Sequence, residues 1–145
     1  MLCGIKTKTT IMPTHQHTNN RNTNGTLERI TYKNINAIGV DLLLDIQMWY
    51  PCQNQSGMHN YEICRSYYDV TPGIRPHIRD VQVIDAHAPD AWRSLWLNCL
   101  PESPCKNITF KNVATGKSTL PAVCENVQGS VSGSSASLSH NCFST

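Results

Sequence analysis

The residues with the clearest chemical potential are the cysteines, of which the 145-residue chain has seven. No two of them form a Cys-x-x-Cys pair, the close spacing that usually places two thiolates on one zinc ion. The intervals between them instead suit short loops closed by disulfides. We therefore predict three disulfides, with Cys3 left over: Cys52 with Cys64, Cys99 with Cys105, and Cys124 with Cys142.

Three Asn-x-Ser/Thr triplets add to this picture, at Asn24, Asn54 and Asn107. Together with the cysteines, these glycosylation sites predict a secreted, extracellular protein, because disulfides persist in oxidising compartments. The first ten residues carry two lysines and no apolar stretch long enough for a signal peptide. A chain with the cysteines and sequons of a secreted protein but without such a signal suggests a fragment or an incomplete gene model.

The composition excludes several classes of partner. Charged residues make up 15% of the chain and the net charge is +2, too weak a balance to indicate nucleic acid, although an acidic polysaccharide is not disfavoured. No apolar run is long enough to span a membrane. His15 and His17 lie in a polar stretch and are interpreted as solvated, so we expect no metal and no cofactor.

An internal repeat indicates how the chain is built. Three segments align without gaps: Leu27–Ile35, Ile78–Ala86 and Cys105–Val113. In each, apolar and polar residues alternate, which predicts a strand with one buried face. Each segment also has Asn or Asp before its last residue, and such a residue suits a turn.

A second β-rich run follows each of the first two segments, at Val40–Trp49 and Ser94–Cys99. The interval from Val81 to Ile108 is 27 residues, the length of a β-solenoid coil. A leucine-rich repeat lacks support because its Leu-x-x-Leu-x-Leu pattern is absent. An immunoglobulin-like sandwich is disfavoured by the three self-similar segments, because the strands of a sandwich need not resemble one another. We expect one all-β solenoid domain over residues 1–145, with a loop at 11–26, a disulfide-stapled insertion at 52–69 and an irregular tail at 128–145.

The segment Leu100–Val113, with its Pro-Glu-Ser-Pro turn and Asn-Ile-Thr-Phe-Lys-Asn-Val strand, resembles glycoside hydrolase family 28, the polygalacturonases. Cys99 and Cys105 have the spacing of a cysteine pair in that family, and Cys124–Ser130 is similar to its C-terminal Cys-x-Asn-x-x-Gly-Ser segment. The resemblance covers roughly residues 4–142. It implies a right-handed parallel β-helix, a pectin or polygalacturonate substrate, a cell-wall location, and a monomer for the full-length form.

Inverting hydrolysis of a glycosidic bond needs a carboxylic acid and a carboxylate base on opposite faces of the sugar. The family carries these in Asn-Thr-Asp and Asp-Asp motifs followed by Gly-His-Gly, and none of these strings occurs here. The resemblance therefore implies that the catalytic aspartates lie upstream, that the β-helix is truncated at its N-terminal end, and that this chain alone is inactive. Asp80 and Asp85 are interpreted as structural, Asp41 flanks a buried strand, and Asp45 is the least explained aspartate.

By the same resemblance, two residues bind substrate. Lys6 matches the lysine of the family's Arg-Ile-Lys motif, whose arginine position is Gly4 here, and Tyr50 matches a tyrosine that lines the sugar subsite. Losing the arginine removes a bidentate partner for a carboxylate. Trp92 and Trp96 are expected to pack in the core or at a coil edge.

Two alternatives stay open. The chain could be a non-catalytic β-helix that binds acidic polysaccharide or protein, or a related glycosidase acting on rhamnogalacturonan or xylogalacturonan; the glycine at position 4 allows both. A truncated solenoid would expose an apolar end and unpaired strands, so we expect the isolated chain to be poorly soluble or to self-associate.

Overall fold

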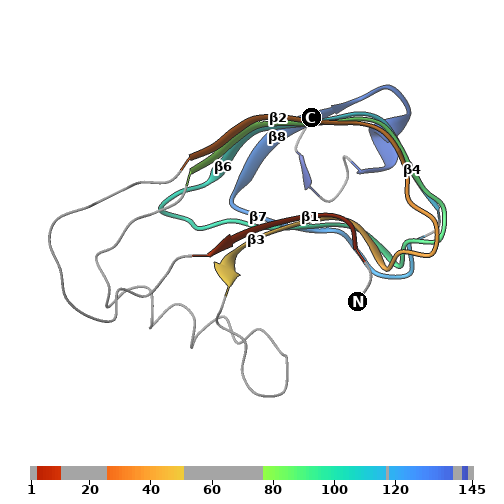
Figure 1. The fold of residues 1–145 in the computed structure, drawn as a ribbon, viewed down its shortest axis with the longest axis horizontal. Coiled ribbons are helices and arrows are strands. Elements are labelled where there is room, and N and C mark those ends of the chain that lie inside the picture. The colour runs from red at the N-terminus through yellow and green to blue at the C-terminus, as the bar shows by residue number, and fades with distance from the viewer. Residues whose placement is uncertain (1–2, 11–25, 51–76, 117, 139–141, 144–145) are drawn as a thin grey trace, which may run out of the picture.

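A computed structural model describes residues 3–10, 26–50, 77–116, 118–138 and 142–143. It contains two parallel sheets of four strands each, which face one another as two layers (Figure 1). The first sheet has the strand order β1 (Cys3–Thr10), β3 (Leu42–Tyr50), β5 (Arg93–Asn98) and β7 (Val123–Glu125). The second has the order β2 (Thr26–Asn36), β4 (His77–Ala88), β6 (Cys105–Thr115) and β8 (Val127–Ser132).

Successive strands alternate between the two sheets, so each turn of the chain adds one strand to each layer. The only helix longer than a turn in the described residues is the 3-10 helix η1 (Gly133–Leu138), and the class is all-β. No helix in the described part of the chain is long and apolar enough to cross a membrane.

The register of the second sheet follows the repeat in the sequence. Ile30 of β2 pairs with Val81 of β4, and Val81 pairs in turn with Ile108 of β6. At the other end of the repeat, Ala86 pairs with both Ile35 and Val113. The predicted strands are therefore present and paired as the alignment of the three segments places them, with the second runs forming β3 and β5.

The core lies between the two sheets and is built from alternate residues of each strand. Val83, Ile108 and Phe110 on one sheet and Leu44 and Leu97 on the other are at most 1% exposed. Burying a side chain of this size contributes about 1.5–3 kcal/mol. The facing apolar rows thus account for most of the attraction that holds the layers together.

The chain bends at two columns of residues with left-handed backbone conformation. The first ladder consists of Arg29, Asp80 and Asn107, and the second of Asn34, Asp85 and Asn112, all with φ between 53° and 58°. Asn and Asp tolerate this conformation better than other non-glycine residues. The backbone is left-handed at the predicted turn positions, but the strands continue through them, so they are bends within β2, β4 and β6 and not turns between strands. Asp80, expected on the polar side of a straight strand, is itself at such a bend.

Side chains of the ladders bond across neighbouring strands. Asn107 Nδ2 donates to Asp80 Oδ1 at 2.6 Å, and Asn112 Nδ2 donates to Asp85 Oδ1 at 3.0 Å. The partners are 27 residues apart in both cases. These hydrogen bonds therefore hold the bends of neighbouring strands in line with one another.

The C-terminal region differs from the prediction. The tail at 128–145, which was predicted to be irregular, has regular structure as far as Leu138. Residues of β8 pair with β6, and η1 follows. The Gly- and Ser-rich composition that indicated irregular structure instead permits close approach: a Cβ on Gly129 would lie 1.9 Å from the carbonyl oxygen of Ile108. The buried hydroxyl of Ser135 accepts a hydrogen bond from the Val113 amide at 2.7 Å.

The opposite end of the second sheet is more open. The inward residues Leu27, Tyr32 and Ile35 of β2 are only partly buried, whereas the corresponding residues of β4 and β6 are almost fully buried. In the described residues β2 pairs on one side alone, with β4. It is therefore an edge strand with a partly uncovered apolar row.

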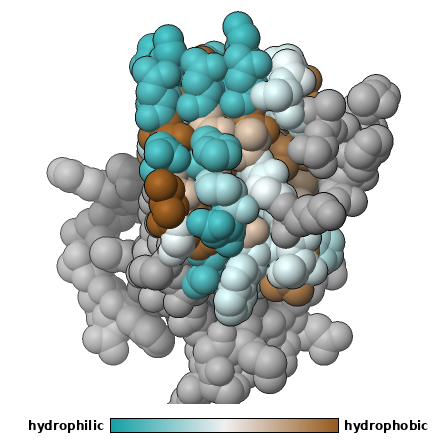
Figure 2. Space-filling view, turned by 90° about the vertical axis from the view of Figure 1, so that its right-hand side faces the viewer, coloured by the Kyte–Doolittle hydropathy of each residue, from teal (hydrophilic) through white to brown (hydrophobic). Residues whose placement is uncertain are grey.

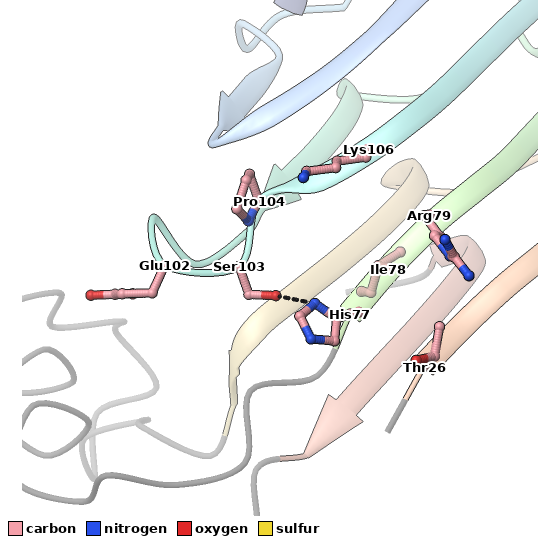
Figure 3. A pocket seen from close by; sticks show the side chains of 8 residues that line it. All are labelled: Thr26, His77, Ile78, Arg79, Glu102, Ser103, Pro104 and Lys106. Atoms are coloured by element: carbon pink, nitrogen blue, oxygen red, sulfur yellow. Dashed lines mark hydrogen bonds between the residues drawn. The ribbon is translucent and has the colours of Figure 1, made fainter. Parts of the chain in front are cut away.

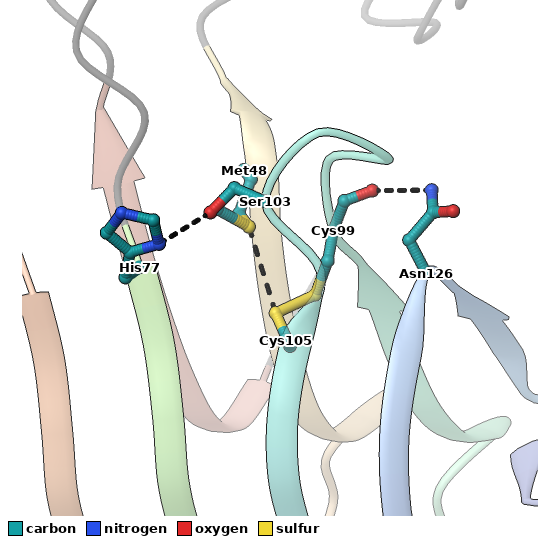
Figure 4. The surroundings of a disulfide bond; sticks show 6 residues. All are labelled: Met48, His77, Cys99, Ser103, Cys105 and Asn126. Atoms are coloured by element: carbon teal, nitrogen blue, oxygen red, sulfur yellow. Dashed lines mark hydrogen bonds between the residues drawn. A yellow bond between two sulfur atoms is a disulfide. The ribbon is translucent and has the colours of Figure 1, made fainter.

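Two of the three predicted disulfides are present, Cys99–Cys105 and Cys124–Cys142. The first closes the turn between β5 and β6, where Cys105 Sγ packs 3.7 Å from Met48 Sδ, and Asn126 Nδ2 donates to the Cys99 carbonyl oxygen at 2.9 Å (Figure 4). The predicted pair Cys52–Cys64, the insertion at 52–69, residues 11–25 of the loop, and Asn24 and Asn54 lie outside the described residues.

Candidate functional site

The two predicted substrate-binding residues lie on neighbouring strands of the first sheet. Lys6 on β1 is in register with Asp45 on β3, and Tyr50 at the end of β3 is in register with Thr10. The structure thus brings both segments to one sheet. The side chains of Lys6 and Tyr50 are outside the described part, so their roles stay predictions.

Asp45, the aspartate with least explanation in the sequence, is 1% exposed. It lies between Leu44 and Ile46, which belong to the core, so strand alternation directs it to the other face of the sheet. Its register neighbours are Lys6 on one side and Trp96 on the other. A carboxylate this well shielded does not fit the role of a base that activates water for a polymeric substrate.

Three further aspartates, Asp41, Asp80 and Asp85, have structural positions. Asp90 is an exposed residue of the turn after β4, and Asp69 lies outside the described residues. Asp80 and Asp85 belong to the ladders and accept hydrogen bonds there. Asp41 directly precedes β3, and its carbonyl oxygen accepts the Arg93 amide at 3.0 Å. The interpretation of Asp80 and Asp85 as structural agrees with these contacts.

The tryptophans differ from each other. Trp96 is partly buried, with the Arg93 guanidinium carbon 4.7 Å from its ring centroid. Trp92 is 62% exposed, so it lies at a coil edge as expected but projects into solvent. Ile38 and Leu120, which lie in other turns between the two sheets, are also exposed. Figure 2 faces that side of the molecule, where hydrophobic and hydrophilic residues are mixed.

A separate cavity of about 340 Å³ lies where β4 and β6 begin (Figure 3). The turn between β5 and β6 forms one wall and contributes Glu102, Ser103 and Pro104. The strands contribute three side chains that carry or can carry positive charge: His77, Arg79 and Lys106.

The turn is fastened to β4 by a hydrogen bond of 3.0 Å between Ser103 Oγ and His77 Nδ1. The Ser103 amide also donates to the Leu100 carbonyl oxygen at 3.1 Å, and the Cys99–Cys105 disulfide closes the same turn. A serine beside a histidine is the pairing of an activated nucleophile. Ser103 is only 2% exposed, however, so the bond serves to position the turn and the imidazole.

A row of charges crosses the second sheet beside this cavity. Glu28, Arg79 and Lys106 are register partners on β2, β4 and β6. Arg79 Nε donates to Glu28 Oε2 at 2.6 Å, and Arg79 Nη2 makes a second contact with the same oxygen. Lys106 forms no ion pair within the described residues.

These cavity residues were not identified from the sequence, although one signal was present. Each repeat has a charged residue in its second position: Glu28, Arg79 and Lys106. Aligning the repeats by register places these residues side by side. The contribution of the turn could not be found in this way, because it depends on the contact between His77 and Ser103, which are 26 residues apart in the sequence.

Within the described residues, no group of three or more His, Cys, Asp or Glu side chains is placed to hold a metal ion. Comparisons of the chain with protein-family models, with curated proteins and with solved structures found no match.

Proposed function

We propose that this chain is the C-terminal part of a polygalacturonase-type hydrolase of glycoside hydrolase family 28, which cleaves α-1,4 galacturonosyl linkages of pectin. The supporting observation is the parallel register that stacks the three repeats, with successive strands alternating between two sheets. Such stacking of repeats is consistent with a parallel β-helix, and the family resemblance implies that it is right-handed. The two disulfides are compatible with the extracellular location that such a substrate requires.

In this proposal strands β1 and β3 of the first sheet carry the substrate. Lys6 supplies a point charge for a galacturonate carboxylate, and Tyr50 supplies a ring for a sugar face. Gly4 on the same strand offers no second cation, so orientation of the carboxylate is weaker than an arginine would give.

The acid and the base are proposed to come from further coils that stack on β1 and β2. Asp45 is shielded, and Asp80 and Asp85 are engaged in the ladders, so none of them is free to take either role. The partly buried apolar row of β2 offers a surface on which another coil could pack. An inverting mechanism would then proceed between two carboxylates on those coils.

The test is reducing-sugar release from polygalacturonate by the 145-residue chain and by a version extended upstream of Met1. We expect activity in the extended version alone, reduced by Lys6→Gln and unaffected by Lys33→Gln, a matched change on exposed β2. Activity in the short chain would refute the assignment of the carboxylates to other coils. Inactivity of both would refute the hydrolase proposal.

The alternative is a non-catalytic β-helix that binds acidic polysaccharide or protein. The burial of Asp45 favours it, because this aspartate of the first sheet is then not exposed to serve as a base. Polygalacturonate binding by the extended version without any hydrolysis would support this alternative.

A further inference from the structure

The cavity at the start of β4 and β6 belongs to the second sheet, whereas Lys6 and Tyr50 lie on the first. Its lining combines Arg79, Lys106 and His77 with the turn that holds Ser103. The proposed cleft does not use any of these side chains. The cavity is therefore available for a separate role.

Charge is unevenly compensated around this cavity. Arg79 is held on one side by Glu28, and Asp80 Oδ2 lies 4.0 Å from its Nε. On its other side it is in register with Lys106, on a neighbouring strand about 4.8 Å away. In Figure 3 the side-chain ends of Arg79 and Lys106 point apart, and Lys106 forms no ion pair within the described residues, so its charge is available to an anion.

The neighbouring groups add directed donors. Ser103 Oγ and His77 Nδ1 share a hydrogen bond of 3.0 Å, and the tautomer in which the hydroxyl donates leaves Nε2–H as a donor for a ligand. Glu102, the acidic residue of the turn, points away from Arg79 and Lys106 in Figure 3. Pro104 supplies an apolar surface beside Lys106 that suits the C–H face of a sugar ring.

We propose that this cavity binds the carboxylate of an acidic saccharide, with Lys106 as its charge partner and His77 and Arg79 as further donors. Among the described residues Lys106 is the lysine or arginine of this cavity without an ion pair, because the charge of Arg79 is already balanced by Glu28, and one such cation matches a monoanion. The identity of the saccharide as a galacturonate oligomer rests on the proposed function. The site would hold the polymer away from the cleft and raise its local concentration.

The experiment is calorimetric titration of the 145-residue chain with a galacturonate trimer. We expect Lys106→Gln to weaken binding about tenfold, the loss of one charge-assisted contact. Lys111→Gln, which makes the same change at another exposed position of β6, should leave the dissociation constant unchanged. Far-ultraviolet circular dichroism of both variants verifies that they fold.

Three results would overturn the proposal. The first is equal affinity of Lys106→Gln and the parent chain for the galacturonate trimer, and the second is equal affinity of the parent chain for a neutral galactose trimer. The third is competition by inorganic sulfate as effective as that by the trimer, which would identify a general anion site. The proposed reaction is separable from this site. Binding that depends on Lys106 without hydrolysis by the extended version refutes the reaction alone, and hydrolysis with binding unaffected by Lys106→Gln refutes the site alone.

Discussion

The first ladder contains one residue that does not suit its conformation, and replacing it should stabilise the protein. Arg29 has φ of 58°, whereas the equivalent residues of β4 and β6 are Asp80 and Asn107. A left-handed conformation costs a typical residue about 1–2 kcal/mol, and Asn adopts it more readily because its short side chain can bond locally. We predict that Arg29→Asn raises the free energy of unfolding.

The magnitude follows from three contributions. Relief of the backbone conformation should contribute roughly 1 kcal/mol. A new amide hydrogen bond to Asp80, like the one from Asn107 on the other side, should add about 0.5 kcal/mol at this exposed position. The change removes the ion pair of Arg29 with Glu28, whose side chains are 81% and 22% exposed, and such a pair contributes at most about 0.5 kcal/mol. The net gain is about 1 kcal/mol.

The assay is urea unfolding followed by circular dichroism, with two controls. Lys33→Asn introduces the same residue at an exposed position of β2 outside both ladders, and should not stabilise. Arg29→Ala removes the side chain but keeps the unfavourable backbone, and should not stabilise either. If Arg29→Asn is no more stable than Lys33→Asn, the first ladder does not control the conformation of β2.

Two sets of substitutions and one solution measurement probe the fold, and one substitution probes its modification. Gly129→Ala should destabilise the protein by roughly 3 kcal/mol or more, since the new Cβ would meet the backbone of β6. Gly39→Ala should cost at most about 2 kcal/mol, because no atom lies within 4 Å of its added Cβ. Equal losses of stability in thermal unfolding would contradict the close packing at Gly129. Replacing Cys124 and Cys142 with serine should lower stability by about 3 kcal/mol, given the 18-residue separation that the disulfide closes, and an unchanged urea midpoint would argue against it. Expressed through a secretory pathway, the chain should lose one glycan on Asn107→Gln, and identical intact masses after accounting for the substitution would show that this exposed asparagine is unmodified. Light scattering should show concentration-dependent association of the 145-residue chain through the open edge of β2, whereas a monodisperse monomer would contradict that expectation.

The strands could be predicted from the sequence because they depend on a local pattern. Alternation of apolar and polar residues identified Ile78–Ala86 and Cys105–Val113 as strands, and the constant interval placed them in register. The disulfides Cys99–Cys105 and Cys124–Cys142 followed from short separations. β8 was missed because Gly and Ser indicate loops when the neighbouring strand that they approach is not considered.

The candidate sites were harder to predict because they depend on contacts between distant segments. The shielding of Asp45 could not be read from β3 alone, since a polar residue on the outer face of a strand is ordinarily exposed. The cavity required the meeting of His77 with Ser103 and of Arg79 with Lys106. A single strand contains only one member of each pair.

The stacking of repeats explains why surface chemistry in this chain occurs in columns. Each position of the repeat occurs again at the same height on the neighbouring strand. A residue type that recurs at that position therefore forms a continuous row across the sheet. Where the position carries Asn or Asp, as at Asp85 and Asn112, the row supports the bend. Where the position is free of that requirement, its charge can vary from strand to strand, as from Glu28 to Arg79, without disturbing the register. Changing one such residue should therefore alter what the surface binds while leaving the stack intact, and this separation allows Lys106→Gln to test binding independently of folding.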